Sequence, residues 1–385
     1  MPRPPRCDQF SPEQISYCHL IQRCVRRAYL AGLDPVSGKN YDFRRQWIRT
    51  RMERLASVFG IDLLAYAILS NHMHLVVRTR PDVVESWSDK EVSLRWLRLF
   101  PGRRLDEQLG EPTTADVDAL ASDTSKIKEI RSRLSNPSWF MKALCEPIAR
   151  LANRQDEVTG HFWEGRFKAI ALIDEAALLA CSMYVDLNPI QAAMAETIEK
   201  SVHSSGYDRY HASRGATIPS AAAELVAMDT EQAGKIIRNS TPEELQTRRQ
   251  KSRYRRGPSI AQDAWLAPIP LGLSNEGLQT SKTGVRASDR GFLSLDWAEY
   301  FKLLVWTAKS RSRTSDSSKI PNDLAPILNR VGIDGGMLCE LVWGFMKYFG
   351  RASAAGSPKS LKERASSLQR RFCPGQRSAA ECFAH

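Results

Sequence analysis

The strongest constraint on the fold is a pair of apolar segments separated by only two residues. "IDLLAYAIL" (61–69) is almost entirely apolar, and "HMHLVVR" (72–78) follows directly after Ser70 and Asn71. Ser and Asn favour tight turns, and two strands joined by so short a turn pair in antiparallel fashion. We therefore expect a β-hairpin whose second strand begins with a His-Met-His sequence.

Other strands and helices flank this hairpin. "SYCHLIQRCV" (16–25) alternates in the manner of a half-buried strand. "NYDFRRQWIRTRMERLASVFG" (40–60) has apolar residues at helical spacing, with Gly60 as its stop. "VSLRWLRLF" (92–100) predicts a short helix, and the strongly acidic segment at about 105–125 predicts an inserted loop.

The segments that follow complete the pattern. "NPSWFMKALCEPIARLANR" (136–154) predicts a helix capped by its first residue, and "GRFKAIALI" (165–173) predicts a strand. Asp174 then caps a helix that ends before Pro189, where a second helix (189–200) begins. This order of elements predicts an α+β fold in which helices pack on an antiparallel sheet.

The composition changes beyond about residue 210, where Ser, Ala, Arg and Gly become more frequent. We expect a first domain over 1–210, a basic, linker-like region over 211–285, and a helical C-terminal extension over 286–385. Two apolar segments of that extension, 293–309 and 336–350, predict helices. The basic tail that follows contains few apolar residues, so we expect it to be disordered.

The charge of the chain favours a polyanionic partner. Its 385 residues carry a formal net charge of +12, with a pI near 9.4. Six basic residues fall within "RRQKSRYRRG" (248–257). Candidates for phosphate contact in this basic run are Arg248, Arg249, Arg253 and Arg255. A solvated loop remains the alternative interpretation of the run.

The sequence also bears on the location of the protein. It contains no apolar run of about 18 residues that would predict a membrane span, and its start lacks the apolar segment of a signal peptide. The eight cysteines are scattered without a Cys-x-x-Cys pair, which favours reduced thiols over a disulfide framework. We expect a soluble, cytoplasmic protein.

His72 and His74 lie two residues apart on a predicted strand, so their side chains point to the same face of the sheet. Neighbouring imidazoles can each present a ring nitrogen to one metal ion, whereas half-buried histidines without partners are costly. The pair is therefore a candidate metal site. The alternative is an exposed face on which both histidines are solvated.

Tyr184 and Asn188 in "MYVDLNPI" lie four residues apart on a predicted helix and share one of its faces. A tyrosine hydroxyl can attack phosphate once a cation polarises the phosphoryl oxygen. An amide oxygen from Asn188 could complete a mixed nitrogen and oxygen ligand set suited to Mg²⁺ or Mn²⁺. The alternatives are a core aromatic residue and an Asn-Pro helix stop.

"GHFWEGRFK" (160–168) combines turn glycines with aromatic and basic residues. Trp163 could stack on a base, and Arg166 and Lys168 could hold phosphates. The alternative is a β-turn that leads into the following strand.

Taken in order, these motifs resemble a known family. "SNHMHLVVR", "GHFWEGRFK", "YVDLNPIQAAM" and "HSSGY" follow one another with gaps similar to those of the IS200-like (Y1) transposases. The resemblance is strongest to the REP-associated tyrosine transposases, a branch of the HUH endonucleases, and extends over roughly residues 15–210. "CHLIQRCVRR" also resembles the first strand of that family, including its arginine, Arg23. The acidic insertion and the long C-terminal extension depart from the family pattern.

The resemblance implies a ferredoxin-like antiparallel sheet with helices on one face. It also implies that His72 and His74 hold Mg²⁺ or Mn²⁺, with Asn188 as the third ligand. Tyr184 would attack the scissile phosphate, forming a 5′-phosphotyrosine link and a free 3′-hydroxyl. Arg23 joins the residues expected to contact DNA.

The implied enzyme cuts and joins single-stranded DNA near hairpins without a nucleotide cofactor, because the bond energy is kept in the protein–DNA link. Its implied partner is a palindromic repeat that forms a hairpin. Its implied location is the bacterial cytoplasm at the nucleoid, and it would act as a monomer or homodimer.

Other functions compete with this interpretation. A DNA-hairpin-binding regulator could keep the fold and lose the chemistry, although the candidate catalytic and ligand residues are all present. A hydrolase of the amidohydrolase type also begins with His-x-His on a strand, but it needs further histidines at strand ends. His161, His203 and His211 do not fall on such strands. A weak zinc site could use three residues of the tail, Cys373, Cys382 and His385.

Overall fold

The structure, a computed structural model, describes residues 6, 9–11, 13–25, 30–34, 38–100, 112–226, 258–272, 278–310 and 320–382. The predicted phosphate contacts Arg248, Arg249, Arg253 and Arg255 lie outside these residues, and so does His385. The acidic insertion is described from residue 112 onwards.

The secondary structure follows the chain in this order. The strands are β1 (Tyr17–Arg23), β2 (Ile61–Ile68), β3 (His72–Thr79), β4 (Lys168–Leu172), β5 (Thr217–Pro219), β6 (Ser259–Ala261) and β7 (Ala354–Ala355). The helices before residue 200 are α1 (Phe43–Ala56), α2 (Pro81–Ser86), α3 (Asp89–Leu99), α4 (Thr114–Ala121), α5 (Thr124–Leu134), α6 (Pro137–Gln155) and α7 (Glu175–Gln191). The later helices are the 3₁₀ turn η2 (Ile198–Lys200), α8 (Ser205–Ser213), α9 (Ala221–Val226), α12 (Trp297–Ser310), α13 (Ala325–Val331), α14 (Gly335–Phe349), α15 (Pro358–Ser367) and α16 (Gln376–Cys382). Across the described ranges, no helix is both long and apolar enough to cross a membrane.

A five-stranded sheet in the described part of the chain runs in the order β2-β3-β1-β4-β7. The first four strands pair in antiparallel fashion, and β7 pairs in parallel with β4. The α+β class and the predicted hairpin are thus confirmed. The expectation of a purely antiparallel sheet is wrong at this edge, because helices carry the chain back to the same end of β4 before it enters β7.

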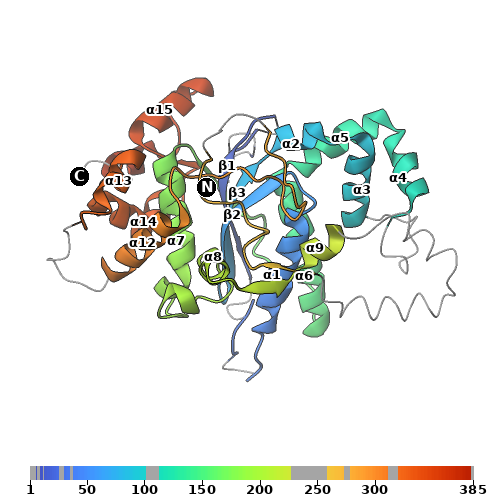
Figure 1. Ribbon diagram of the computed structural model, residues 1–385, viewed down its shortest axis with the longest axis horizontal. Helices are drawn as coiled ribbons and strands as arrows, with labels where there is room; N and C mark the ends of the chain where they lie inside the picture. The colour runs from blue at the N-terminus through green and yellow to red at the C-terminus, as the bar shows by residue number, and fades with distance from the viewer. Residues whose placement is uncertain are drawn as a thin grey trace.

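Helices cover both faces of the sheet, rather than the one face that we expected (Figure 1). On β3, Met73, Leu75 and Val77 point into a core shared with α1 and α6. The alternate residue Val76 lies in a second core, shared with α7, α12 and α14. Every residue of β2 is buried. A sheet with apolar side chains on both faces needs a helical layer on each.

Two predicted helix caps are confirmed. The Asn136 side chain accepts a hydrogen bond from the Ser138 N–H at 2.8 Å, and Asp174 accepts one from the Ala177 N–H at 2.9 Å. The predicted break before Pro189 is wrong, since α7 continues through it to Gln191. Burial along nearly the whole of α7 outweighs the hydrogen bond that the proline cannot donate.

Two segments that we expected to be irregular or disordered contain helices. The described part of the acidic insertion forms α4, which opens with a capping box between Thr113 and Asp116. The tail forms α15 and α16, in which Leu361, Ala365, Ala379 and Cys382 are buried. A low apolar content therefore does not prevent packing where the apolar residues fall at helical spacing. The division into domains stays a prediction.

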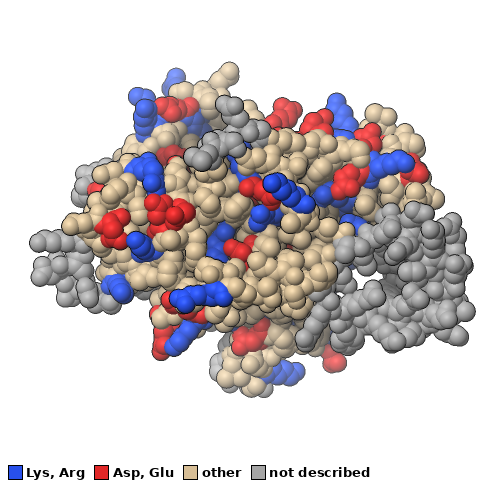
Figure 2. Space-filling view, in the orientation of Figure 1, with Lys and Arg blue, Asp and Glu red and all other residues tan. Residues whose placement is uncertain are grey.

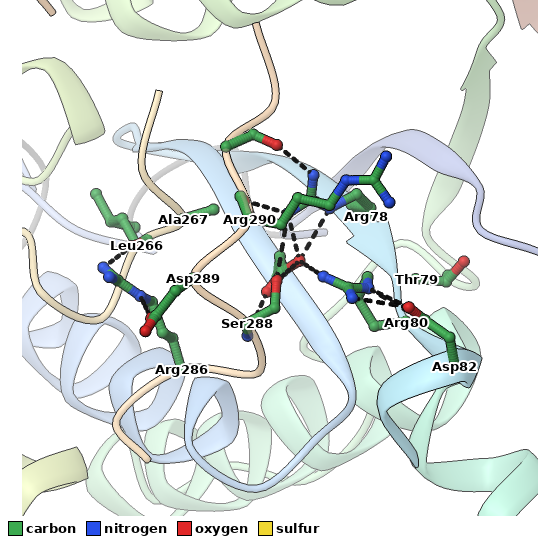
Figure 3. Close-up of polar contacts among 12 residues, drawn as sticks. Arg78, Thr79, Arg80, Asp82, Leu266, Ala267, Arg286, Ser288, Asp289 and Arg290 are labelled. Carbon is green, nitrogen blue, oxygen red and sulfur yellow. Dashed lines mark hydrogen bonds and ion pairs between the residues drawn. The ribbon is translucent and has the colours of Figure 1, made fainter. Parts of the chain in front are cut away.

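A buried ion pair fastens the segment before α12 to the hairpin, as Figure 3 shows. The Asp62 carboxylate on β2 accepts hydrogen bonds from the Arg78 guanidinium on β3 at 2.7 and 2.9 Å, and from the Ser288 hydroxyl at 2.7 Å. Arg78 also donates to the carbonyl oxygens of Arg290 and Gly291, at 2.5 and 2.6 Å. Both partners of the ion pair are fully buried, and the buried Arg80 guanidinium also lies 3.6 Å from the Asp62 carboxylate, so loss of Asp62 would leave two arginine charges in the core without this counter-ion.

Gly291 provides a test of this close packing. A Cβ atom at residue 291 would collide with the carbonyl group of Pro270, and a backbone carbonyl cannot swing aside as a side chain can. We expect Gly291→Ala to lower the free energy of unfolding by about 2 kcal/mol or more, measured by urea denaturation. Gly272→Ala is the matched control, because no described atom lies within 4 Å of its Cβ position. Its effect should stay below about 0.5 kcal/mol, and equal effects at the two glycines would contradict the packing described.

Candidate active site

A cavity of about 290 Å³ opens beside the hairpin. Its walls come from β1, β3, the turn before β4, β4 itself, α7 and α14. The lining residues are Ile21, Gln22, Arg23, His72, His74, Glu164, Gly165, Arg166, Lys168, Tyr184 and Met346. The structure thus brings six of the residues predicted from sequence to one place: His72, His74, Tyr184, Arg23, Arg166 and Lys168.

The two histidines each direct one ring nitrogen away from their protein partners. The His72 Nδ1 contacts the Asn71 Oδ1 at 2.5 Å, and because that oxygen can only accept, the proton lies on Nδ1 and leaves Nε2 with a lone pair. The His74 Nε2 is buried and has no hydrogen-bond partner among the described residues. The ring centroids are 4.8 Å apart. This spacing is compatible with one cation between the two rings.

The remaining ligands would have to be of another kind. No group of three or more His, Cys, Asp or Glu side chains in the described part of the chain is arranged to hold a metal ion. A cation at His72 and His74 would therefore take its other ligands from an amide, from water or from a substrate. Open positions of this sort are typical of metal ions that act on a substrate.

Burial keeps both histidines in the form that a metal ion requires. It lowers the pKa of His72 to about 4, with a smaller contribution from the charge of Arg23. It also holds the pKa of His74 well below its ordinary value, with smaller contributions from the neighbouring His19 and His72. Both rings are neutral at pH 7, the state in which one nitrogen of each ring carries the lone pair that a cation needs.

Tyr184 on α7 faces the histidine pair. Its ring centroid is 5.4 Å from that of His74, and the residue is 7% exposed. On its other side the ring stacks against Phe345 of α14, with centroids 5.7 Å apart. The phenol is therefore held between the hairpin and a helix of the C-terminal extension.

The environment of Tyr184 keeps the phenol protonated at neutral pH. Burial raises its pKa to about 12, and a hydrogen bond with the Asn188 side chain opposes the rise. Asn188 is buried and is not among the cavity-lining residues. Asn188 therefore contacts the tyrosine, whereas His72, His74 and Tyr184 are among the residues that line the cavity.

A buried carboxylate anchors α7 two residues after the tyrosine. Asp186 accepts hydrogen bonds from the Ser205 hydroxyl, from the Gly206 N–H at 2.7 Å and from the Tyr300 hydroxyl at 2.8 Å. These contacts tie α7 to α8 and α12. Within the "HSSGY" sequence, Ser205 and Gly206 therefore position the helix that carries Tyr184 and do not line the cavity.

The basic residues of the cavity differ in exposure. The Arg23 side chain is 59% exposed and lies 3.7 Å from the carboxylate of Glu164, while Arg166 is exposed and Lys168 is partly buried.

Trp163 does not offer its ring for base stacking. It is 9% exposed, and its indole N–H donates to the Cys145 carbonyl oxygen at 2.9 Å within the core beneath the turn.

The net positive charge is not gathered into one patch on the face shown in Figure 2, where basic and acidic side chains are interspersed. The local charge at the cavity is more informative. Three basic residues and one acidic residue line it, so the cavity favours an anionic ligand.

Three residues beside the cavity were not predicted from the sequence: His19 on β1, and Phe345 and Met346 on α14. Strand alternation places His19 on the same face as Arg23, but only the register of β1 against β3 shows that this face also carries His74. No sequence signal connects α14 with the tyrosine, because helices pack through apolar surfaces that are common to many partners.

No protein-family model and no curated protein matches the chain. Among solved structures, it is similar to a REP-associated tyrosine transposase bound to a REP hairpin. The two chains are 14% identical, the similarity covers 52% of this chain and 81% of the other, and the TM-score is 0.27. At these values the likeness carries no functional conclusion, so the case for a function rests on the cavity.

The lowered pKa of His72 predicts how stability depends on pH. The unfolded chain protonates this histidine near pH 6.5, whereas the folded protein does so only near pH 4. The stability contributed by the neutral folded form is present above pH 6.5 and is lost as the pH falls towards 4. In EDTA, we expect the free energy of unfolding to fall less steeply over this range in His72→Gln than in the wild type.

The difference between the two slopes should reach about 1 kcal/mol per pH unit, measured by urea denaturation at several pH values. His161→Gln, at an exposed position, is the matched control. If the free energy of unfolding changed with pH in the same way in the wild type and in His72→Gln, the pKa of His72 would not be lowered in the folded protein.

Proposed function

We propose that the protein is a metal-dependent endonuclease and strand transferase of single-stranded DNA, with Tyr184 as its nucleophile and hairpin-associated sites as its targets. The observation that carries the proposal is the meeting of Tyr184 with the histidine pair at one basic cavity. An uncommitted nitrogen on His72 and on His74 supports it further.

The proposed cation is Mg²⁺ or Mn²⁺. His72 and His74 would hold it through their Nε2 atoms, and the Asn188 amide oxygen is the proposed third ligand. Mixed nitrogen and oxygen donors with open positions suit these ions. When bound, the ion would polarise the scissile phosphate and stabilise the charge that develops on it.

The proposed reaction exchanges one phosphodiester for another. The Tyr184 Oη forms a bond to phosphorus as the bond from phosphorus to the 3′ oxygen breaks. The phenol loses its proton and the leaving oxygen gains one, which gives a free 3′-hydroxyl and a 5′ end attached to Tyr184. The reverse of the same step joins a 3′-hydroxyl to that end, so no nucleotide cofactor is required.

The cavity supports a single-stranded substrate. Its volume of about 290 Å³ is at the lower end of the range for small-ligand pockets, which is roughly 300–1,000 Å³, and suits one nucleotide rather than a duplex. Arg23, Arg166 and Lys168 would contact the phosphates on either side of the scissile one. Glu164 would have to release Arg23 for that residue to do so.

The topology supports the ferredoxin-like core that this proposal includes. The elements β1, α1, β2, β3, α6 and β4 follow the βαββαβ order once the insertion between β3 and α6 is set aside. The two helices of that unit pack in the same core, on one face of the four strands.

A DNA-hairpin-binding regulator is the competing function. The observation in its favour is the burial of Tyr184, because a phosphate must reach the phenol oxygen for cleavage to occur. The two candidates differ in whether a covalent protein–DNA product forms.

A covalent product should depend on Tyr184. We expect wild-type protein, Mn²⁺ and a single-stranded hairpin from repeats near the gene to give a protease-sensitive adduct on a denaturing gel. Tyr184→Phe should abolish that adduct, because the attacking oxygen is removed, and leave hairpin affinity nearly unchanged. Tyr210→Phe is the matched control, because Tyr210 lies on α8 and does not line the cavity.

The outcomes separate the two functions. Binding without an adduct, for many hairpins and for both Mg²⁺ and Mn²⁺, would favour the regulator. Normal cleavage by Tyr184→Phe would show that another residue is the nucleophile.

Arg166 should contribute to affinity through a phosphate contact. We expect Arg166→Ala to weaken binding of single-stranded DNA and to reduce the slope of log affinity against log salt by about 0.7, the value for one phosphate contact to a single strand. Arg150→Ala on α6 is the matched control, since its side chain is 74% exposed and lies outside the cavity. Equal slopes for the wild type and Arg166→Ala would remove Arg166 from the interface.

A further inference from the structure

A third histidine lies directly behind the pair that lines the cavity. His19 on β1 is fully buried, and its Nε2 lies 2.8 Å from the Nδ1 of His74. The two ring planes lie within 22° of parallel, with centroids 5.0 Å apart. The rings of Tyr184 and Phe345 also pack near His19, steeply tilted to it, with centroids 6.0 and 5.7 Å away.

Within the described residues, the His19 side chain makes its hydrogen bond with His74. Its other nitrogen, Nδ1, is buried without a hydrogen-bond partner among the described residues. A buried histidine with one unsatisfied nitrogen is costly. An apolar residue of similar size would fill a purely structural role better. The burial of His19 therefore calls for a role for its Nε2, which contacts His74.

The hydrogen bond between the two rings can be made in two ways, because a neutral imidazole has one N–H and one lone pair. In the first, the His74 Nδ1–H donates to the His19 Nε2, and the His74 Nε2 keeps a lone pair. In the second, the His19 Nε2–H donates to His74, whose Nε2 then carries a hydrogen. Only the first arrangement leaves His74 able to bind a cation through Nε2.

We propose that His19 is a positioning residue: it accepts the Nδ1–H of His74 and so holds that ring in the tautomer and orientation whose Nε2 lone pair faces the cavity. The inference rests on the proposed function, in which His74 is a metal ligand. Hydrogen bonds of this kind orient ligating histidines, and their loss commonly weakens metal affinity 10- to 100-fold. The usual acceptor is a carboxylate or a carbonyl, and here it is a second imidazole.

Two substitutions of like chemistry separate this role from packing. The amide oxygen of His19→Gln can occupy the position of the His19 Nε2 and accept the same hydrogen bond. The amide of His19→Asn is one methylene shorter and cannot reach His74. Both variants place an uncharged amide in the same buried site, so their effects on folding should be similar, and circular dichroism and thermal unfolding check this.

The measurement is the Mn²⁺ affinity of the full chain, titrated by electron paramagnetic resonance without DNA. We expect His19→Asn to weaken Mn²⁺ binding at least about 10-fold, and His19→Gln to stay within about threefold of the wild type. Equal affinities for the two variants would overturn the inference. With Mg²⁺ and ¹⁵N-labelled histidine, long-range nitrogen–proton spectra should show the His74 proton on Nδ1, and a proton on Nε2 would also overturn it.

His74→Ala distinguishes failure of this inference from failure of the proposed function. If His74→Ala binds Mn²⁺ as tightly as the wild type, the proposed metal site is wrong and the role of His19 falls with it. If His74→Ala loses Mn²⁺ while His19→Asn retains it fully, the metal site stands and only the role of His19 is wrong.

Discussion

The pairing of β1 with β3 is the interaction on which the candidate site depends. Ile21 lies opposite His74 and Arg23 lies opposite His72, so both strands contribute to one wall of the cavity. If one strand slipped by one residue against the other, the cavity-facing side chains of that strand would turn into the core shared with α1 and α6. The apolar residues that fill that core therefore specify the position of the polar residues on the opposite face.

The C-terminal extension holds α7 against this face. Phe345 stacks on Tyr184, Met346 lines the cavity, and Tyr300 donates to the carboxylate of Asp186. The ion pair of Asp62 and Arg78 secures the segment that leads into these helices. Because α7 is packed between the sheet and the extension, the position of Tyr184 depends on residues far from it in sequence.

Much of the site could be predicted from the sequence because its signals are local. The alternation on β3 places His72 and His74 on one face, and the spacing of four residues places Tyr184 and Asn188 on one side of a helix. His19 could not be assigned to the site, because that needs the register of β1 against β3. Trp163 resembles a stacking residue in sequence, yet its apolar ring is buried and its N–H bonds to Cys145. Tertiary packing, which no short segment encodes, decides both cases.

Peptide mapping of a protein–DNA product tests the central claim most directly. Trypsin would release the peptide 169–200, in which Tyr184 is the one tyrosine, so a nucleotide on this peptide identifies the nucleophile without any substitution. After incubation with Mn²⁺ and single-stranded hairpin DNA, followed by digestion of the DNA, we expect the mass spectrum to show a nucleotide on peptide 169–200 alone. A nucleotide on another peptide, or cleaved DNA with free 5′-phosphates and an unmodified peptide, would contradict the mechanism.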